Sequence, residues 1–303
     1  MFREGIININ KPADWTSQDV CAKLRGRLHI KHIGHTGTLD PMATGVLPIC
    51  IGKATRIIEY YDQDTKSYRA SMQLGIETDT LDITGNVTKT TDFGGITRED
   101  LLNVCSRFVG IIEQIPPKYS AIKINGRRAY DLAREGADVE IKPRKVNIIS
   151  IDVLSFDEKR GVVDMIISCG KGTYIRSLCD DIGRALGCGA TMTGLARIQN
   201  GYFTLENSYE LKDVVEMTDE EINSIIISMD ETITLLGTVE LNSSRVKAFT
   251  NGNESYSKGY KIIKNTEYKD CYKVYSDGQF LGVGSIENEI LKPEKVIILE
   301  NNN

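Results

Sequence analysis

The segment from residue 33 to residue 56 constrains the fold of this chain more than any other. It combines four glycines and two prolines with one brief apolar run at residues 46 to 51. Glycine and proline interrupt regular structure, whereas a short apolar run bounded by them is typical of a buried strand. The segment therefore predicts a loop that feeds a buried strand. Asp40 lies in this loop beside Pro41 and among small residues, so the backbone around it can approach a ligand closely.

Strand and helix patterns alternate along the rest of the chain. Strands are expected at 5–10, 68–74, 121–124, 145–155 and 162–169, and helices at about 16–28, 97–108 and 127–135, the last closed by Gly136. A further helix begins near Tyr174, and its apolar residues recur at three- and four-residue spacing, which predicts one buried face that excludes Arg176. Residues 206–231 are expected to be helical or connecting, and 238–300 to form short strands. The pattern predicts a large domain followed by a small β-rich one.

Composition excludes several classes of protein. The seven cysteines are an odd number without a Cys-x-x-Cys pair, which argues against a disulfide framework and a zinc ribbon and favours small core residues. No stretch approaches the roughly 18 consecutive apolar residues that a membrane span requires. Residues 1–5 lack the apolar run of a secretory signal. We therefore expect a cytoplasmic protein without a membrane partner.

The net charge of -5 is unevenly distributed. Residues 204–303 hold 18 acidic against 10 basic side chains, a net charge of -8, so residues 1–203 carry +3. Basic residues cluster between Lys118 and Lys145, including Arg127 and Arg128, and a smaller group spans residues 23–31. Such clusters are often solvated helix faces, but they also provide the charge that phosphate contacts need.

The sequence argues against two other kinds of site. The three histidines, at 29, 32 and 35, are spaced like metal ligands, but the glycines that follow interrupt any helix that would align them, so no metal is expected. His35 is instead expected to belong to a site. The run from Gly52 to Thr55 resembles the end of a phosphate-binding loop, yet the preceding glycine is too distant and Ala54 stands where a hydroxyl is required.

The run from Gly34 to Leu47, Gly-His-Thr-Gly-Thr-Leu-Asp-Pro-Met-Ala-Thr-Gly-Val-Leu, closely resembles the signature loop of the TruB family of tRNA pseudouridine-55 synthases. Further segments agree with the family in the same order, at 11–17, 52–56, 66–70, 75–82, 116–123, 125–136, 172–178 and 195–203. The resemblance extends from the start of the chain to about residue 205 and weakens beyond.

The resemblance implies an α+β pseudouridine synthase fold around a central mixed, largely antiparallel sheet. It places the catalytic domain at 1–235 and a short PUA-like RNA-binding domain, rich in strands, at 236–303. The implied activity is isomerisation of uridine 55 in the T-loop of tRNA by base flipping, without a cofactor or metal. The expected partner is the T-arm of tRNA, and the expected state is a monomer.

The resemblance also implies roles for individual residues. Asp40 is expected to be the essential aspartate, Tyr68 the stacking tyrosine and Arg176 the arginine paired with the aspartate. The expected substrate-binding residues are His35, which holds the nucleotide extruded, the pocket-lining Tyr174 and Leu195, and Lys11, Arg127 and Arg128. Without the surrounding motifs, Tyr68, Tyr174 and Leu195 would be assigned to core packing.

An RNA-binding folding helper, for which refolding of tRNA is the useful activity, is the main alternative function. A phosphate enzyme acting on small molecules is a second one, and the failed loop spacing counts against it.

Overall fold

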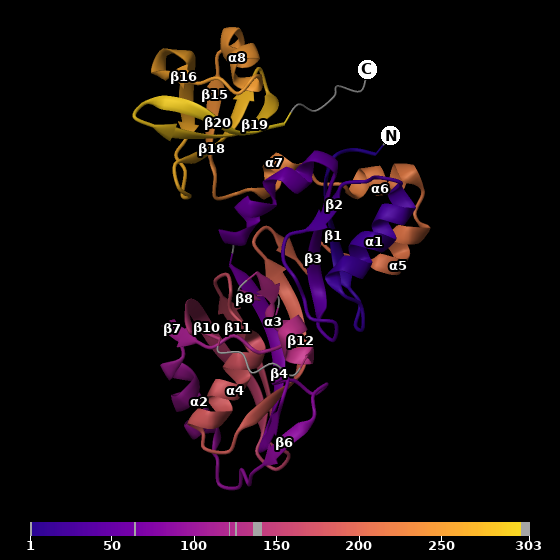
Figure 1. Ribbon diagram of the computed structural model, residues 1–303, viewed down its shortest axis with the longest axis vertical. Helices are drawn as coiled ribbons and strands as arrows, with labels where there is room; N and C mark the ends of the chain where they lie inside the picture. Colours follow the sequence, from indigo (N-terminus) through magenta and orange to yellow (C-terminus); the bar gives the residue numbers. More distant parts are fainter. Residues whose placement is uncertain (1, 64, 121, 125, 136–140, 298–303) are drawn as a thin grey trace.

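A mixed sheet of ten strands forms the body of the molecule (Figure 1). The computed structural model describes residues 2–63, 65–120, 122–124, 126–135 and 141–297. Across the sheet the strands follow the order β14 (Tyr209–Glu210), β1 (Gly5–Lys11), β3 (Thr44–Ile51), β12 (Ala190–Asn200), β4 (Lys66–Leu74), β11 (Val162–Cys169), β10 (Arg144–Asp157) and β7 (Gly110–Gln114). In addition, β2 (Ile33–His35) pairs with β3, and β13 (Phe203–Thr204) pairs with β12.

The pairing within this sheet is largely antiparallel. Strands β1 and β14 run parallel, as do β3 and β12, and the other pairs that the described residues form are antiparallel. The α+β fold with a central mixed, largely antiparallel sheet is therefore confirmed. Two small antiparallel ladders lie outside it, formed by β5 (Ile76–Thr78) with β6 (Val87–Thr90) and by β8 (Lys123–Ile124) with β9 (Arg127–Arg128).

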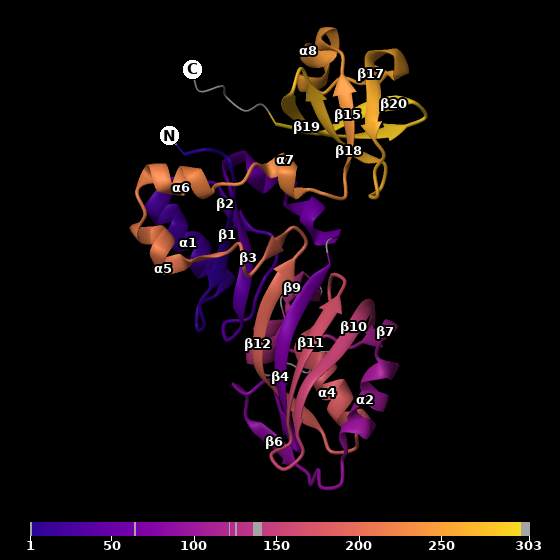
Figure 2. The same cartoon turned by 180° about the vertical axis from the view of Figure 1, so that it is seen from behind.

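Helices cover the sheet in two groups. At one end, α1 (Ser17–Leu28), α5 (Leu211–Glu216) and α6 (Asp219–Ile225) lie beside β1 and β2, and at the other α2 (Arg98–Arg107) packs on β10 and α4 (Ile175–Ala185) on β12 and β4 (Figures 1 and 2). The remaining helical elements are the 3-10 helix η1 (Gly52–Gln63), α3 (Ala129–Arg134), α7 (Met229–Thr232), η2 (Ser243–Arg245), α8 (Val246–Thr250) and η3 (Ser257–Gly259). None of the helices in the described part of the chain is both long and apolar enough to span a membrane.

Local sequence signals explain where the main helices begin. Thr16 accepts a hydrogen bond from the backbone of Asp19, whose side chain accepts one from Thr16 in return, so this capping box starts α1. Thr97 and Asp100 form the same arrangement at the start of α2. Helix α4 buries the face that its apolar spacing predicts, from Ile175 to Ile182. Six of the seven cysteines are buried and all seven are free, as expected of core residues.

The segment around residue 127 differs from expectation. Arg127 and Arg128 belong to strand β9, and the helix begins only at Ala129. The two arginines pair with β8, and the backbone N–H of Ala129 donates to the carbonyl of Ile122 over 2.7 Å, which closes the hairpin before the helix can start. The helix expected from residue 127 begins two residues later, because hairpin pairing outweighs local propensity here. Ala121 and Gly136, which were expected to bound these elements, lie outside the described residues.

A second sheet of six strands follows the first. Its order is β16 (Ser255–Tyr256), β20 (Ile290–Val296), β19 (Gln279–Glu287), β18 (Cys271–Ser276), β15 (Gly237–Leu241) and β17 (Tyr260–Lys264). One apolar cluster lies within it, and another joins it to the first sheet: Phe280 and Val283 of β19 pack with Tyr60 and Tyr61 of η1. The phenol of Tyr275 also donates to Asp230 over 2.6 Å. The C-terminal β-rich part is therefore packed on the first sheet through a shared core.

Gly45 permits the parallel contact between β3 and β12. Its φ of +101° is a conformation that side chains rarely adopt, and a Cβ at this position would lie 2.2 Å from the carbonyl oxygen of Arg197. The absence of a side chain lets the strand that follows Asp40 pair with Ala196 and Arg197.

We expect Gly45→Ala to lower the free energy of unfolding by at least about 2 kcal/mol, because it adds a backbone clash to an unfavourable φ. Gly95→Ala is the matched control: its φ is +89°, but a Cβ there meets nothing within 4 Å. That change is expected to cost only about 1 kcal/mol. Urea unfolding measures both, and equal losses would show that the close approach to Arg197 has no energetic role.

Candidate active site

Arg176 joins the Asp40 loop to the segments around residues 80–82 and 119. It lies in the first turn of α4 and is 5% exposed. Its Nε and Nη2 lie 3.0 and 3.1 Å from the two carboxylate oxygens of Asp40. Nη1 donates to Asp82 and to the carbonyl of Thr80, both at 3.2 Å, and Nη2 also donates to the carbonyl of Tyr119 at 3.1 Å. Of the five N–H donors of a guanidinium, four donate hydrogen bonds here, and Nε forms an ion-pair contact with Asp40.

Asp40 remains partly open although its charge is paired. Its side chain is 33% exposed, against 6% for that of Arg176. Burial raises the pKa of Asp40 above the ordinary 3.8, and the Arg176 guanidinium opposes this rise. The bidentate contact fixes the plane of the carboxylate. A carboxylate held in this way, with part of its surface accessible, can act as a nucleophile or stabilise positive charge that develops on a ligand.

Asp82 is a site residue that sequence reasoning did not single out. It is 4% exposed and lies 3.2 Å from Arg176 Nη1, on the side of the guanidinium away from Asp40. The backbone N–H of Thr84 and the hydroxyls of Thr80 and Thr84 all donate to its Oδ1. These donors hold Asp82 so that it orients Arg176. Asp82 ends the segment at 75–82 that agrees with the family, and this could have marked it as a site residue. An aspartate in a turn, however, is most often a local hydrogen-bond acceptor.

The Asp40 loop is held by side chains on both sides of the aspartate. The Ser17 hydroxyl accepts from the backbone N–H of Leu39 at 2.9 Å and lies 3.3 Å from its carbonyl. The Lys11 ammonium donates to the carbonyls of Pro12, Trp15 and Pro41 at 2.8, 2.6 and 3.0 Å. The loop backbone next to Asp40 is thus fixed before any ligand binds.

The structure does not place Lys11 where a substrate-binding residue was expected. It is 0% exposed, and its three N–H donors match three backbone acceptors. Burial lowers the pKa of Lys11 to about 8. Lys11 is the last residue of β1, which borders the Asp40 loop. Its side chain extends to the backbone carbonyls there and not to solvent, so the ammonium holds the loop from the protein interior.

Tyr68 and Arg197 lie opposite each other on neighbouring strands. The two residues are register partners of β4 and β12, and both are buried. Burial raises the pKa of Tyr68, and the positive charge of Arg197 opposes this rise. Arg197 was also missed from sequence, where it stands within a family segment at 195–203 but has no local feature that marks it as a site residue.

His35 lies at the end of β2, immediately before the loop. Its Nε2 is 3.2 Å from the side-chain nitrogen of Gln18 on α1, and its Nδ1 is buried without a hydrogen-bond partner among the described residues. Burial, and secondarily the charge of Arg197, lowers the pKa of His35. The ring is therefore neutral at pH 7, and a nitrogen is available for a polar contact.

Tyr174 and Leu195 border the same region from two other elements. Tyr174 precedes α4, and its backbone exchanges hydrogen bonds of 2.8 and 3.1 Å with the side chain of Gln114. Burial raises the pKa of Tyr174. Leu195 is half-buried on β12, opposite Ala70 of β4. The charge of Asp40 acts on both Tyr68 and Tyr174, so these two phenols lie near the carboxylate.

Arg127 and Arg128 lie on the hairpin β8–β9. The Arg127 side chain is exposed and forms an ion pair with Glu135, which is also exposed. The hairpin and α3 lie in front of the main sheet in Figure 1.

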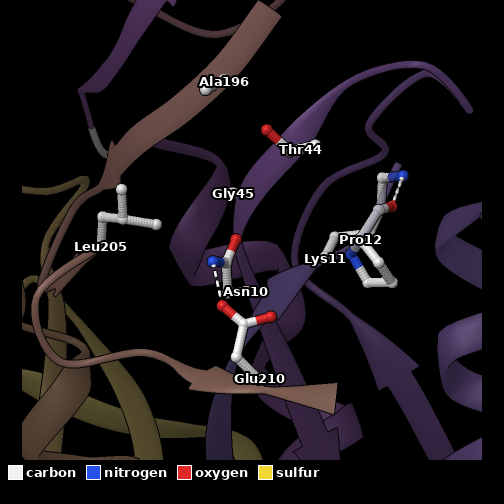
Figure 3. A pocket seen from close by; sticks show the side chains of 8 residues that line it. All are labelled: Asn10, Lys11, Pro12, Thr44, Gly45, Ala196, Leu205 and Glu210. Carbon is white, nitrogen blue, oxygen red and sulfur yellow. Dashed lines mark hydrogen bonds between the residues drawn. The ribbon is translucent and has the colours of Figure 1, made fainter. Parts of the chain in front are cut away.

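A pocket of about 260 Å³ lies beside the loop but not over the aspartate (Figure 3). It is lined by Asn10, Lys11, Pro12, Thr44, Gly45, Ala196, Leu205 and Glu210, and the Asn10 amide donates to Glu210 over 2.7 Å. Successive residues of a strand point to opposite faces of the sheet. Ile9 packs in the same core cluster as Tyr68. The next residue, Asn10, therefore points to the other face, and the pocket that it lines opens there. Asp40, Tyr68 and Arg176 do not line it. Within the described ranges, no group of three His, Cys, Asp or Glu side chains is arranged to hold a metal ion.

Comparison with known proteins agrees with this arrangement. Residues 25–175 match the model of the TruB family pseudouridylate synthase N-terminal domain, and residues 176–234 match that of the tRNA pseudouridylate synthase B C-terminal domain. A tRNA pseudouridine synthase B of Clostridium perfringens strain 13 is 44% identical over 98% of this chain and 99% of its own length. One of Clostridium tetani is 42% identical over 97% of this chain and 99% of its own.

Solved structures agree as well. A Cbf5-Nop10-Gar1 complex contains a chain with a TM-score of 0.76 and 28% identity, matched over 96% of this chain and 84% of that one. An H/ACA RNP bound to a substrate RNA containing 2'-deoxyuridine gives a TM-score of 0.75 at 25% identity, over 98% of this chain and 86% of that one. The fold, the near-complete coverage by curated relatives and the family models lead to one assignment: this chain belongs to the TruB family of pseudouridylate synthases.

Proposed function

We propose that this protein isomerises uridine 55 in the T-loop of tRNA to pseudouridine, with Asp40 as its catalytic carboxylate. The observation that carries the proposal is the bidentate contact between Arg176 and a carboxylate that is still one-third exposed. Family membership and relatives named tRNA pseudouridine synthase B support the reaction and the tRNA substrate. That the target is the uridine at position 55 of the T-loop is our own inference.

The reaction conserves atoms and needs no change of oxidation state. The N1–C1' bond of uridine breaks, the base turns, and a bond forms between C5 and C1', while C5 loses a proton and N1 gains one. An ionised Asp40 stabilises or attacks the carbon that loses the base, and Arg176 keeps the carboxylate charged and oriented. In this proposal Tyr68 stacks on the uracil. The side chains of Tyr174 and Leu195 border the space that the base enters.

A uridine within a folded loop must leave its stack to reach Asp40. Unstacking costs a few kcal/mol, which contacts to the extruded nucleotide and to phosphates offset. We assign His35 to the extruded nucleotide because its ring is neutral and one nitrogen lacks a protein partner among the described residues. Arg127 and Arg128 are proposed to contact the backbone of the T-arm. The exposure of Arg127 supports this role.

The remaining parts of the proposal concern the whole chain. We assign residues 1–235 to catalysis and residues 236–303 to a PUA-like RNA-binding domain, which the start of β15 at Gly237 and the separate apolar cluster of the second sheet support. We also propose a monomer in the cytoplasm. A tRNA folding helper is not favoured, because that activity does not call for an oriented carboxylate next to a buried guanidinium.

Replacing the proposed catalytic carboxylate tests the function directly. We expect Asp40→Asn to lower the single-turnover rate of pseudouridine formation at least about a thousandfold, because the amide carries no charge. tRNA affinity should be largely kept. Asp152→Asn on the exposed part of β10 is the matched control and should leave the rate unchanged. Mapping of pseudouridine in an unmodified tRNA transcript measures both, and substantial activity in Asp40→Asn would refute the assignment.

The ion pair between Arg176 and Asp40 predicts how activity depends on pH. Activity requires ionised Asp40, so it falls as pH is lowered through the pKa of that group, which burial places above 3.8. In Arg176→Lys the two-point contact of the guanidinium with the carboxylate is lost. The positive charge of the lysine then stabilises ionised Asp40 less strongly, so the pKa of Asp40 rises further. We expect a rate about a hundredfold lower and an acid limb at higher pH. An unshifted limb in the pH–rate profile would show that Arg176 does not control the ionisation of Asp40.

The hairpin arginines make a prediction about binding. We expect Arg127→Ala with Arg128→Ala to weaken tRNA binding and to reduce the slope of log affinity against log salt by about 1 to 2, as lost phosphate contacts do. The matched control is Arg160→Ala, at the exposed turn between β10 and β11. Filter-binding titrations at several salt concentrations measure this, and an unchanged slope would remove the hairpin from the interface.

A further inference from the structure

Arg197 is a buried cation that the ion pairs of the site do not include. It is 1% exposed, on the part of β12 that pairs with both β3 and β4. Among the described residues, no carboxylate lies within 4.0 Å of its guanidinium. Burial of a charge without a counter-charge is unfavourable. Its position at the centre of the site therefore indicates that the charge serves a purpose beyond packing.

The contacts of Arg197 connect both ends of the Asp40 loop. Its Nε donates to the carbonyl of Val46 over 2.7 Å, and its Nη2 donates to the carbonyl of Gly37 over 3.1 Å. Gly37 precedes Asp40 and Val46 follows it, so one planar group fixes the separation of the two loop ends. A Cβ on Gly37 would lie 3.4 Å from Nη1, which shows how closely the loop packs on the guanidinium.

Tyr68 is the register partner of Arg197 across β4 and β12. Burial raises the pKa of the Tyr68 phenol, and the charge of Arg197 opposes this rise, so the guanidinium lies close to the phenol. Because a guanidinium can only donate, it leaves the phenol O–H to donate elsewhere. Arg197 thus connects Tyr68 with the two ends of the loop.

We propose that Arg197 is a positioning residue that holds the Tyr68 hydroxyl and the Asp40 loop in one register, and that its charge favours the negative charge which uracil carries during the reaction. The inference rests on the proposed function. When the N1–C1' bond breaks, its electron pair leaves with the base. The pair is returned when C5 bonds to C1', C5 then loses its proton, and N1 gains one. A cation behind the tyrosine that stacks on this base lowers the energy of the anionic stage.

The test is a double-mutant cycle between Arg197 and Tyr68 in the full-length protein. Arg197→Lys keeps the charge but loses the fork, and Tyr68→Phe removes the hydroxyl while it keeps the ring. Arg69→Lys is the matched control, on an exposed residue of β4. Single-turnover rates on an unmodified tRNA transcript, tRNA affinity and the thermal midpoint are measured for each variant. The wild-type rate tests the proposed function, and the comparison of variants tests the inference.

We expect Arg197→Lys to bind tRNA as the wild type does and to react about 10 to 100 times more slowly. In the Tyr68→Phe background the same change should cost less than about threefold, because the group that Arg197 positions is already gone. Arg69→Lys should react at the wild-type rate. Three results would overturn the inference: a wild-type rate in Arg197→Lys, losses that multiply in the double variant, or an Arg197→Lys protein that does not fold, which would assign the residue to the fold alone.

Discussion

The site depends on one guanidinium whose three nitrogens all contact oxygen atoms. Arg176 binds both oxygens of Asp40, and it also binds Asp82 and two backbone carbonyls. Contacts at all three nitrogens leave the guanidinium one orientation, and its two contacts with Asp40 fix the orientation of the carboxylate as well. Asp82 contributes a negative charge that pairs with the Arg176 guanidinium at Nη1, away from the two nitrogens that bind Asp40. The accessible third of the Asp40 side chain is thereby presented in a defined direction.

Two other buried cations, Lys11 and Arg197, bind the backbone of the Asp40 loop. Lys11 binds three backbone carbonyls, including that of Pro41, and Arg197 binds those of Gly37 and Val46. Carbonyl groups of an irregular loop lack the partners that a helix or sheet would supply, and buried donors must replace them. The loop around Asp40 is therefore rigid because charged side chains from two strands satisfy its backbone. The glycine at 45 lets one of these strands approach closely enough.

Much of this could be predicted from the sequence, for reasons that differ between residues. The strand after the loop followed from an apolar run between glycines and prolines, and the apolar face of α4 followed from helical spacing, although Arg176 beside that face is buried as well. The roles of Asp40 and Tyr68 came from the resemblance, because an aspartate in a loop and a tyrosine in a strand are ordinary by themselves. The burial of Lys11, the contact of Asp82 with Arg176 and the pairing of Arg197 with Tyr68 could not be predicted. They depend on which strands become neighbours, and local pattern does not determine that. The hairpin at Arg127 was misread as helix for the same reason.

The central claim is that Arg176 keeps Asp40 charged and oriented in a partly buried site. A carbon-13 NMR titration of the Asp40 carboxyl, assigned by its loss in Asp40→Asn and compared between the wild type and Arg176→Met, tests it most directly. The account predicts that the wild-type carboxyl titrates above the ordinary 3.8 yet is ionised at neutral pH, and that it titrates at clearly higher pH once the guanidinium is removed. Identical titration curves in the two proteins would contradict it.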